Sequence, residues 1–160
     1  MTTNQRPEIQ TLANLQSAFA GESMAHIKYR YFAKLVRAMG DEATARIFEE
    51  TADQEVMHAF GHLDLLYPKA SMTPAKALQI AIDGETYEYT EMYPGFRAVA
   101  QAEGNAAAVA EMNEQIEESK VHAAQFTATL QKAQKRFAAL ARVEERHANH
   151  YKEQLTKVAA

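Results

Sequence analysis

The chain of 160 residues contains no cysteine and no tryptophan. Without cysteine it can form neither a disulfide framework nor a thiolate site for zinc or iron–sulfur chemistry. Any redox metal must therefore be held by glutamate, aspartate and histidine. Glycine and proline are also scarce, at six and four residues, and long stretches contain neither. This scarcity predicts an all-α chain.

Other kinds of sequence are missing as well. The net charge of −4 offers no basic face for nucleic acid. No apolar run approaches the roughly 20 residues that span a bilayer. The first ten residues are polar and show no signal-peptide core, so we expect a cytoplasmic protein. The length and the 47% hydrophobic content suit one domain with a buried core, so residues 1–160 are expected to form a single domain.

Apolar residues recur every three or four positions in two long regions, which predicts two pairs of helices. The first pair covers residues 7–67 and turns at Gly40-Asp41. The clear linker covers residues 68–73. The second pair covers residues 74–157 and opens at Thr73-Pro74, a capping residue followed by proline in the first helical position.

Two breaks are expected in the second pair. Pro94-Gly95 predicts a kink, and the segment 103–105 predicts a turn before a long stretch without glycine or proline. We expect an extra helical segment around residues 105–135, which either lengthens these helices or forms an added hairpin.

Each apolar stripe carries a glutamate near its middle. These residues are Glu22, Glu55, Glu85 and Glu144. Burying one uncompensated carboxylate costs several kcal/mol, so four in one small bundle require positive charge nearby. Lysine and arginine do not lie on the stripes in matching number. Two divalent metal ions would supply the charge.

The spacing of the polar residues supports metal binding. Glu55/His58 and Glu144/His147 are both Glu-x-x-His, and Glu85/Glu88 have the same separation. Three residues on a helix correspond to about 60° of rotation and ~4.5 Å of rise, so both side chains can reach one ion. Two Glu-x-x-His pairs with two further glutamates match the general pattern of di-iron helical bundles. Oxygen-rich ligands with two imidazoles favour iron, with manganese possible.

Four segments resemble the rubrerythrin family. They are Phe19–Ser23, Glu50–Glu55 with His58, Gly84–Pro94, and Arg136–His147. The resemblance implies a ferritin-like four-helix bundle that binds two iron ions. It implies that Glu55 and Glu144 bridge the ions and that Glu22 and Glu85 are terminal ligands.

The same resemblance assigns the remaining site residues. It implies that His147 ligates one iron, and that Glu88 and His58 exchange as ligands of the other when its oxidation state changes. Tyr29 and Tyr93 are similar to family tyrosines that hydrogen-bond to ligand glutamates. The implied activity is that of an oxidoreductase, a non-haem di-iron peroxidase that reduces hydrogen peroxide to water in oxidative stress defence.

The chain departs from the family because it has no cysteine for the usual rubredoxin domain. Its electrons must then come from a separate donor, such as a rubredoxin-like protein. Three alternatives remain open at this point: a ferroxidase, oxidase or iron-handling protein with the same site, a dimanganese catalase, and a metal-free helical interaction protein. The last of these leaves the mid-stripe carboxylates unexplained.

A rival ligand pair also remains open. Glu22 and Glu55 are 33 residues apart, whereas Glu85 and Glu144 are 59 apart; Glu118 lies 33 residues after Glu85 and is followed by His122. The interpretation favoured from sequence keeps Glu144/His147, because the segment from Phe137 to Tyr151 resembles the last helix of the family. The alignment that uses Glu118/His122 also requires a glutamate at the position of Ser119.

The linker is short for a ferritin-like bundle. Its second and third helices run parallel, so the chain must travel back over about 22 residues of helix, roughly 33 Å. The residues between Leu66 and Pro74 span at most ~28 Å. The hypothesis is a domain-swapped homodimer, in which the first helix pair of one copy packs on the second pair of the other.

Overall fold

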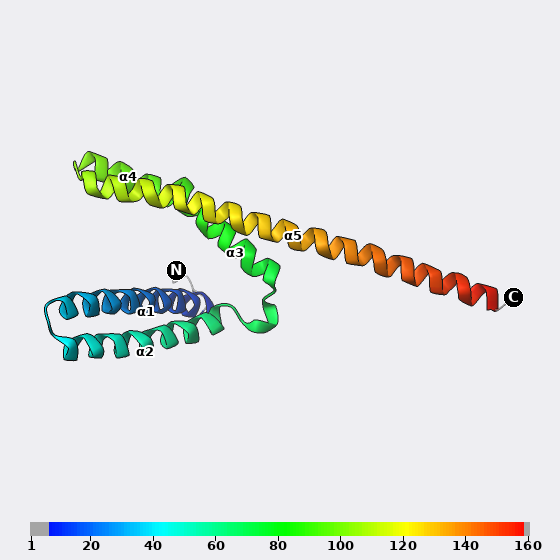
Figure 1. Ribbon diagram of the computed structural model, residues 1–160, viewed down its shortest axis with the longest axis horizontal. Coiled ribbons are helices and arrows are strands. Elements are labelled where there is room, and N and C mark those ends of the chain that lie inside the picture. The colour runs from blue at the N-terminus through cyan, green and yellow to red at the C-terminus, as the bar shows by residue number, and fades with distance from the viewer. Residues whose placement is uncertain (1–6, 159–160) are drawn as a thin grey trace, which may run out of the picture. The chain divides into compact units, whose positions relative to one another are not determined.

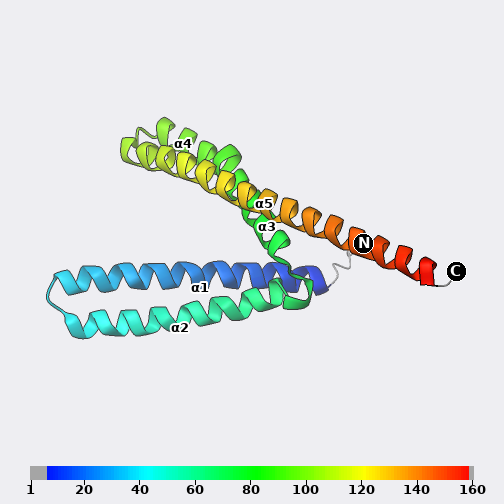
Figure 2. The ribbon, with the colours of Figure 1, turned by 45° about the vertical axis from the view of Figure 1, so that its right-hand side comes forward.

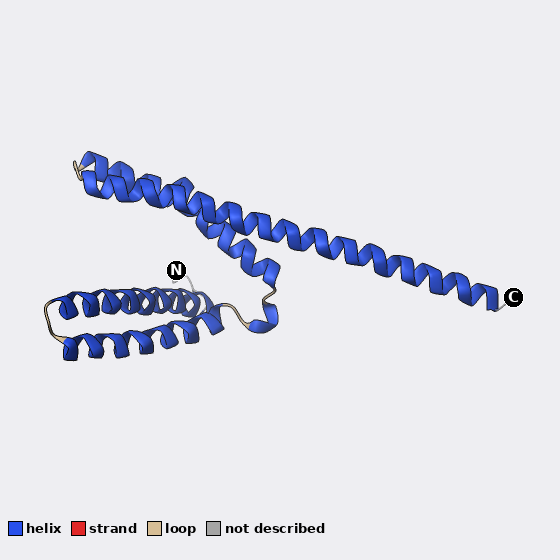
Figure 3. Cartoon of the chain, viewed as in Figure 1, coloured by secondary structure: helices blue, strands red, loops and turns tan. Residues whose placement is uncertain are grey.

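We describe a computed structural model of the chain, in which residues 7–158 are placed and side chains are described from residue 10 onward. The all-α class is confirmed, because the described residues form helices joined by short connections and contain no strand (Figure 3). They divide into two compact units between Met72 and Thr73. Within the described range, no helix is long and apolar enough to cross a membrane.

The first unit is an antiparallel hairpin of α1 (Pro7–Ala38) and α2 (Glu42–Leu66), which lie side by side in Figures 1 and 2. The turn falls at the predicted glycine, since Gly40 has a φ of +91°, a conformation that side chains disfavour. Asp41 then caps α2, its carboxylate accepting a hydrogen bond from the Thr44 amide at 3.0 Å.

Small residues bring the two helices of this hairpin together. Ala45, Ala52 and Ala59 recur every seven residues along α2 and are buried, and Ala33 of α1 is also buried. Without large side chains between them, the helix backbones can approach closely. The ring of His26 bridges the helices, with Nδ1 2.7 Å from the Ala52 carbonyl oxygen. Glu55, the glutamate of the predicted apolar stripe in this helix, is half-buried.

The second unit contains α3 (Pro74–Tyr87), a five-residue π-turn η2 (Glu88–Met92), α4 (Tyr93–Ala102) and α5 (Ala106–Val158). The predicted start is confirmed, because Thr73 Oγ1 accepts a hydrogen bond from the Lys76 amide at 3.1 Å. The predicted break at Pro94 takes the form of the π-turn just before it. Proline lacks an amide hydrogen, so the regular helical ladder cannot continue through this position.

The long last helix starts at the predicted turn. Gly104 has a φ of +72°, and the side chain of Asn105 caps the helix by accepting from the Ala108 amide at 3.1 Å. From there α5 continues for 53 residues without interruption. The extra residues therefore lengthen the last helix and form no added hairpin. Residues 106–130 pack on α3 and α4, whereas most side chains of residues 131–158 are exposed.

The linker between the units is partly coiled. Helix α2 ends at Leu66 and α3 begins at Pro74, within one residue of the predicted bounds. Between them Lys69–Ser71 forms one turn of 3₁₀-helix, η1. A 3₁₀ turn rises only about 2.0 Å per residue, so this connection spans less than a fully extended chain of the same length.

Candidate metal centre

Three predicted ligands converge in the first unit. Glu22 of α1 and Glu55 and His58 of α2 each offer a ligand atom, and these atoms lie within 4.8 Å of one another. His58 Nδ1 is 2.9 Å from Glu55 Oε2. Both glutamates are half-buried and the histidine is exposed. Two carboxylates and an imidazole that point at one place form a suitable partial site for a divalent cation.

The predicted carboxylates of the second unit lie against α5. Glu85 Oε2 of α3 is 3.4 Å from His122 Nδ1, and Glu88 Oε2 accepts a hydrogen bond of 2.9 Å from the Ser119 hydroxyl. Ser119 is buried, so its hydroxyl is a dedicated partner for Glu88. The structure thus places the imidazole of the rival pair, and not that of His147, beside Glu85.

One oxygen of this cluster lacks a hydrogen bond. Among the described residues, Glu85 Oε2 is the buried side-chain atom for which no hydrogen-bond partner is present. A buried acceptor without a donor costs about 1–3 kcal/mol, and more when it is charged. A bound cation would remove this cost. The residues present therefore fit a metal ion, by their donor chemistry and by this unsatisfied oxygen.

The π-turn begins at Glu88, next to this cluster, and the Tyr93 amide donates to the Glu88 carbonyl oxygen. Widening the helix by one residue per turn changes the direction of every following side chain, and single π-turns are frequent at functional sites. Sequence reasoning predicted a kink at Pro94 but not its form. Proline shortly after two glutamates spaced by three residues is the signal that could have indicated a local widening.

The two predicted tyrosines differ in their surroundings. Tyr93 lies beside the carboxylates of the second unit: burial raises the pKa of its phenol, and the negative charges of Glu88, Glu111 and Glu85 raise it further. Its phenol therefore stays protonated and can donate a hydrogen bond to a carboxylate. Tyr29 lies on α1, the same helix as Glu22. Its ring packs on the ring of Phe48 in α2, with centroids 5.9 Å apart. Its predicted hydrogen bond to a ligand glutamate stays a prediction.

Glu144 and His147 lie elsewhere on α5. His147 Nδ1 is 3.7 Å from Glu144 Oε2, and their side chains are 61% and 75% exposed. Glu144 follows His122 by 22 residues of continuous helix, which corresponds to about 33 Å. Within this unit the predicted pair therefore cannot share an ion with Glu85. Glu118 is one turn before His122 on the packed part of α5.

The sequence matches the rubrerythrin family twice. The family model aligns with residues 13–69 and again with residues 62–130. The first match contains Glu22, Glu55 and His58. The second contains Glu85, Glu88 and the Glu118/His122 pair, and it ends before Glu144.

Characterised relatives agree with this match. Nigerythrin from Nitratidesulfovibrio vulgaris is 37% identical over 130 residues, which cover 74% of this chain and 64% of the relative. Rubrerythrin from the same organism is 40% identical over 105 residues, and rubrerythrin from Porphyromonas gingivalis is 39% identical over 105 residues. Each of these alignments covers 59% of this chain, and 55% and 52% of those relatives, respectively. The chain thus spans less than two thirds of the length of these relatives.

A solved structure of fully reduced, all-ferrous nigerythrin is also similar to the chain. It is 35% identical in sequence, with 78% of this chain and 67% of that chain covered, at a TM-score of 0.40. The two family matches together extend over most of the sequence, from residue 13 to residue 130. The chain therefore belongs to the rubrerythrin family, which confirms the ferritin-like class expected from its sequence.

Proposed function

We propose that this protein holds two iron ions between a first and a second hairpin and reduces hydrogen peroxide to water with electrons from a separate donor protein. The observation that carries the proposal is the convergence of Glu22, Glu55 and His58 within 4.8 Å. Oxygen and imidazole donors in this proportion favour iron or manganese over zinc or copper.

The proposed ligand set comes from both hairpins. The first supplies the three residues just named. The second supplies Glu85, Glu88, Glu118 and His122. Five carboxylates carry a charge of −5, which lies between the +4 of two divalent ions and the +6 of two trivalent ions, so a closed site would not bury large uncompensated charge.

The Glu118/His122 pair replaces Glu144/His147 in this proposal, for two reasons. His122 already lies 3.4 Å from Glu85, and Glu118 repeats the 33-residue separation of Glu22 and Glu55. Ser119, which stands where the alignment of this pair requires a glutamate, then has a role of its own, because its hydroxyl donates a hydrogen bond to Glu88. Glu118 and His122 are four residues apart, a spacing at which helical side chains are neighbours.

In peroxide reduction the O–O bond breaks, and two electrons and two protons complete two water molecules. Two ferrous ions, when bound, would supply the electrons and act as Lewis acids. The protein's own groups fix the geometry and handle protons. The pKa of the half-buried Tyr93 phenol is raised by burial and by the nearby carboxylates, so the phenol stays protonated and is able to donate a hydrogen bond. Ser119 keeps Glu88 in one orientation until a ligand competes for it.

The proposal includes a homodimer in which the hairpins are exchanged. Each hairpin leaves large apolar side chains exposed, among them Ile27 and Phe60 in the first and Phe96 and Val121 in the second. Such faces need a partner. The coiled linker spans about 24 Å if its 3₁₀ turn is kept, against the roughly 33 Å needed to return along one bundle. A hairpin of a second copy is the partner that this linker allows.

The test begins with protein purified without oxygen and analysed for iron and manganese. Two metal ions per chain are expected. The reduced protein is then mixed rapidly with peroxide or with oxygen while ferric absorption is recorded. Fast oxidation by peroxide and slow oxidation by oxygen support the peroxidase. The reverse order supports an oxidase or ferroxidase, and release of oxygen from peroxide supports a catalase. Protein that binds no metal refutes the proposal.

A further inference from the structure

One seam of residues runs along nearly the whole of α5. Its positions alternate in steps of three and four from Val109 to Val158, the spacing of helices that pack lengthwise on one another. In the first half of the helix these positions are buried or half-buried against α3 and α4. They are Val109, Met112, Ile116, Ser119, Ala123, Phe126, Leu130 and Ala133. The same seam then continues past the start of α3 without a covering helix.

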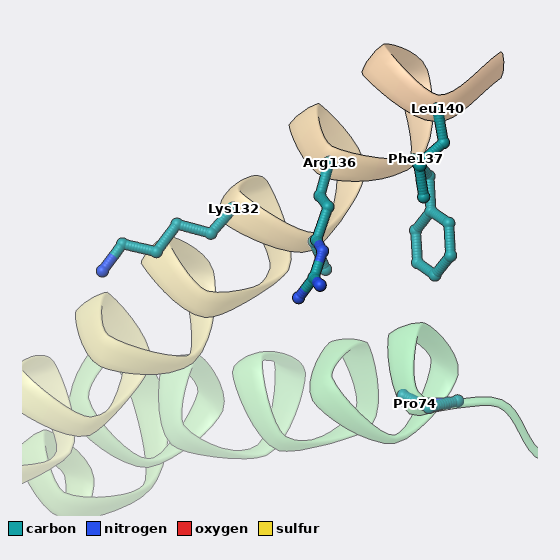
Figure 4. Close-up of a pocket in the computed structure, with 6 residues that line it drawn as sticks. Pro74, Lys132, Arg136, Phe137 and Leu140 are labelled. Atoms are coloured by element: carbon teal, nitrogen blue, oxygen red, sulfur yellow. The ribbon is translucent and has the colours of Figure 1, made fainter. Parts of the chain in front are cut away.

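The uncovered half keeps the seam's apolar character. Phe137, Leu140 and Tyr151 lie on it and are 71%, 52% and 72% exposed. Figure 4 shows where coverage ends: α5 rises away from α3, and Phe137 projects toward Pro74. A cleft of about 600 Å³ opens at this point, lined by Pro74, Lys132, Ala133, Arg136, Phe137 and Leu140. A helix gains most of its stability from packing its apolar face, so this half requires a partner.

We propose that this partner is the same segment, residues 133–158, of a second copy of the chain, packed antiparallel. Glu144 and His147 are the polar positions at the middle of the uncovered seam. In an antiparallel pair centred between residues 145 and 146, Glu144 of each copy faces His147 of the other. A carboxylate then meets an imidazole donor twice, which is a charge-assisted pairing.

This register has two further consequences. Every uncovered seam position finds a partner, because the seam is symmetric about its centre: Phe137 faces Gln154, Leu140 faces Tyr151, and Val158 faces Ala133 at the end of the covered part. Leu155, next to Gln154 and 71% exposed, covers the rest of the Phe137 ring. A parallel pair instead sets Glu144 against Glu144 and His147 against His147. Like charges at the centre oppose that arrangement, as a single polar position does in other helical pairs.

The absence of cysteine makes the register directly measurable, since each introduced thiol is unique. Full-length chains carrying Leu140→Cys and Tyr151→Cys, with different affinity tags, are co-expressed and oxidised. We expect a disulfide that joins the two tags, and no disulfide dimer when either variant is expressed alone. Asn149→Cys, on the outer face of the helix, is the matched control and is expected not to cross-link. Helix content and thermal unfolding, both followed by circular dichroism, confirm that each variant is folded.

An exchange of charges tests the proposed pairing of Glu144 in one copy with His147 in the other. His147→Glu sets glutamates against each other and is expected to remove most of the cross-link between the tagged chains. The double variant Glu144→His with His147→Glu restores the pairing in reversed order and is expected to recover it. Self-cross-linking of Leu140→Cys alone, or folded protein with no cross-link between the tagged variants, overturns the proposal. Because thiol pairing is read independently of metal content, failure here leaves the proposed metal centre untouched.

Discussion

His122 Nδ1 lies 3.4 Å from Glu85 Oε2, and this contact joins α3 to α5 at the carboxylate cluster of the second hairpin. It brings together two residues 37 positions apart in the sequence. The carboxylate oxygen in the contact is buried and accepts no hydrogen bond within the described residues. The imidazole beside the unsatisfied oxygen supports the proposal that His122, and not the His147 favoured from sequence, is a ligand in this cluster.

We predict that His122→Ala lowers iron binding and His147→Ala does not. The first variant removes an imidazole next to Glu85. Loss of a residue that only hydrogen-bonds to a ligand already weakens metal affinity by about tenfold or more, so loss of a ligand is expected to cost at least as much. The measurement is iron bound per chain after dialysis against a chelator. If His147→Ala loses iron while His122→Ala keeps it, Glu144/His147 returns as the ligand pair.

Local signals in the sequence predicted the helix ends well. Thr73 followed by Pro74 starts α3 as expected, and Gly40 ends the first helix as expected. Both depend on chemistry within a few residues, such as a capping hydroxyl or a positive φ, and sequence shows this chemistry directly. The polar positions of the first hairpin were also predictable, because Glu55 and His58 occur one helical turn apart.

The second hairpin was harder to predict from sequence, because the apolar seam of α5 extends beyond α3, the helix on which it packs. Leu130 and Phe137 occupy equivalent positions on one unbroken stripe, yet the first is buried and the second is exposed. Periodicity tells which face of a helix is apolar but not where the neighbouring helix ends. From sequence, the Glu-x-x-His pair Glu144/His147 on the uncovered part was therefore favoured over Glu118/His122 on the covered part. The π-turn was missed for a related reason, since no periodic signal distinguishes it from a kink.

Ser119→Ala is predicted to change the behaviour of Glu88 without unfolding the protein. The variant removes the 2.9 Å hydrogen bond from a buried hydroxyl to this carboxylate. A hydrogen bond to a charged group contributes about 1.5–3 kcal/mol, so the rate of oxidation by peroxide is expected to change by roughly tenfold or more. Metal content is expected to be unchanged. Thr129→Ala, which removes an exposed hydroxyl of the same helix, is the control. Equal rates in the two variants contradict a role for Ser119.

Ala52→Leu is predicted to destabilise the first hairpin. Ala52 has no exposed surface, and its carbonyl oxygen contacts His26, so added methyl groups must push α1 and α2 apart. Overpacking of this kind costs about 1–3 kcal/mol. Thermal unfolding followed by circular dichroism measures the loss. Ala43→Leu, at an exposed position of the same helix, adds the same volume and is expected to leave the melting temperature nearly unchanged.

Exchange of hairpins between two copies makes a prediction that an unexchanged protein cannot satisfy. Glu55→Ala damages the first hairpin and Glu85→Ala damages the second, so each variant alone is expected to lack a complete metal centre. When both chains are co-expressed, a mixed dimer with exchanged hairpins combines the two defects in one site and leaves the other site native. Random pairing then restores about a quarter of the sites.

The measurement is iron content and peroxide-dependent oxidation of the mixed dimer, isolated through two different affinity tags. Exchanged hairpins give one native centre for each mixed dimer, whereas hairpins that pair within one chain give none. The expectation rests on the short connection from Leu66 to Pro74, which is shorter than the roughly 33 Å needed to return along one bundle. Mixed dimers without any active centre, formed from folded chains, would rule out the exchange and require the linker to unwind neighbouring helix ends.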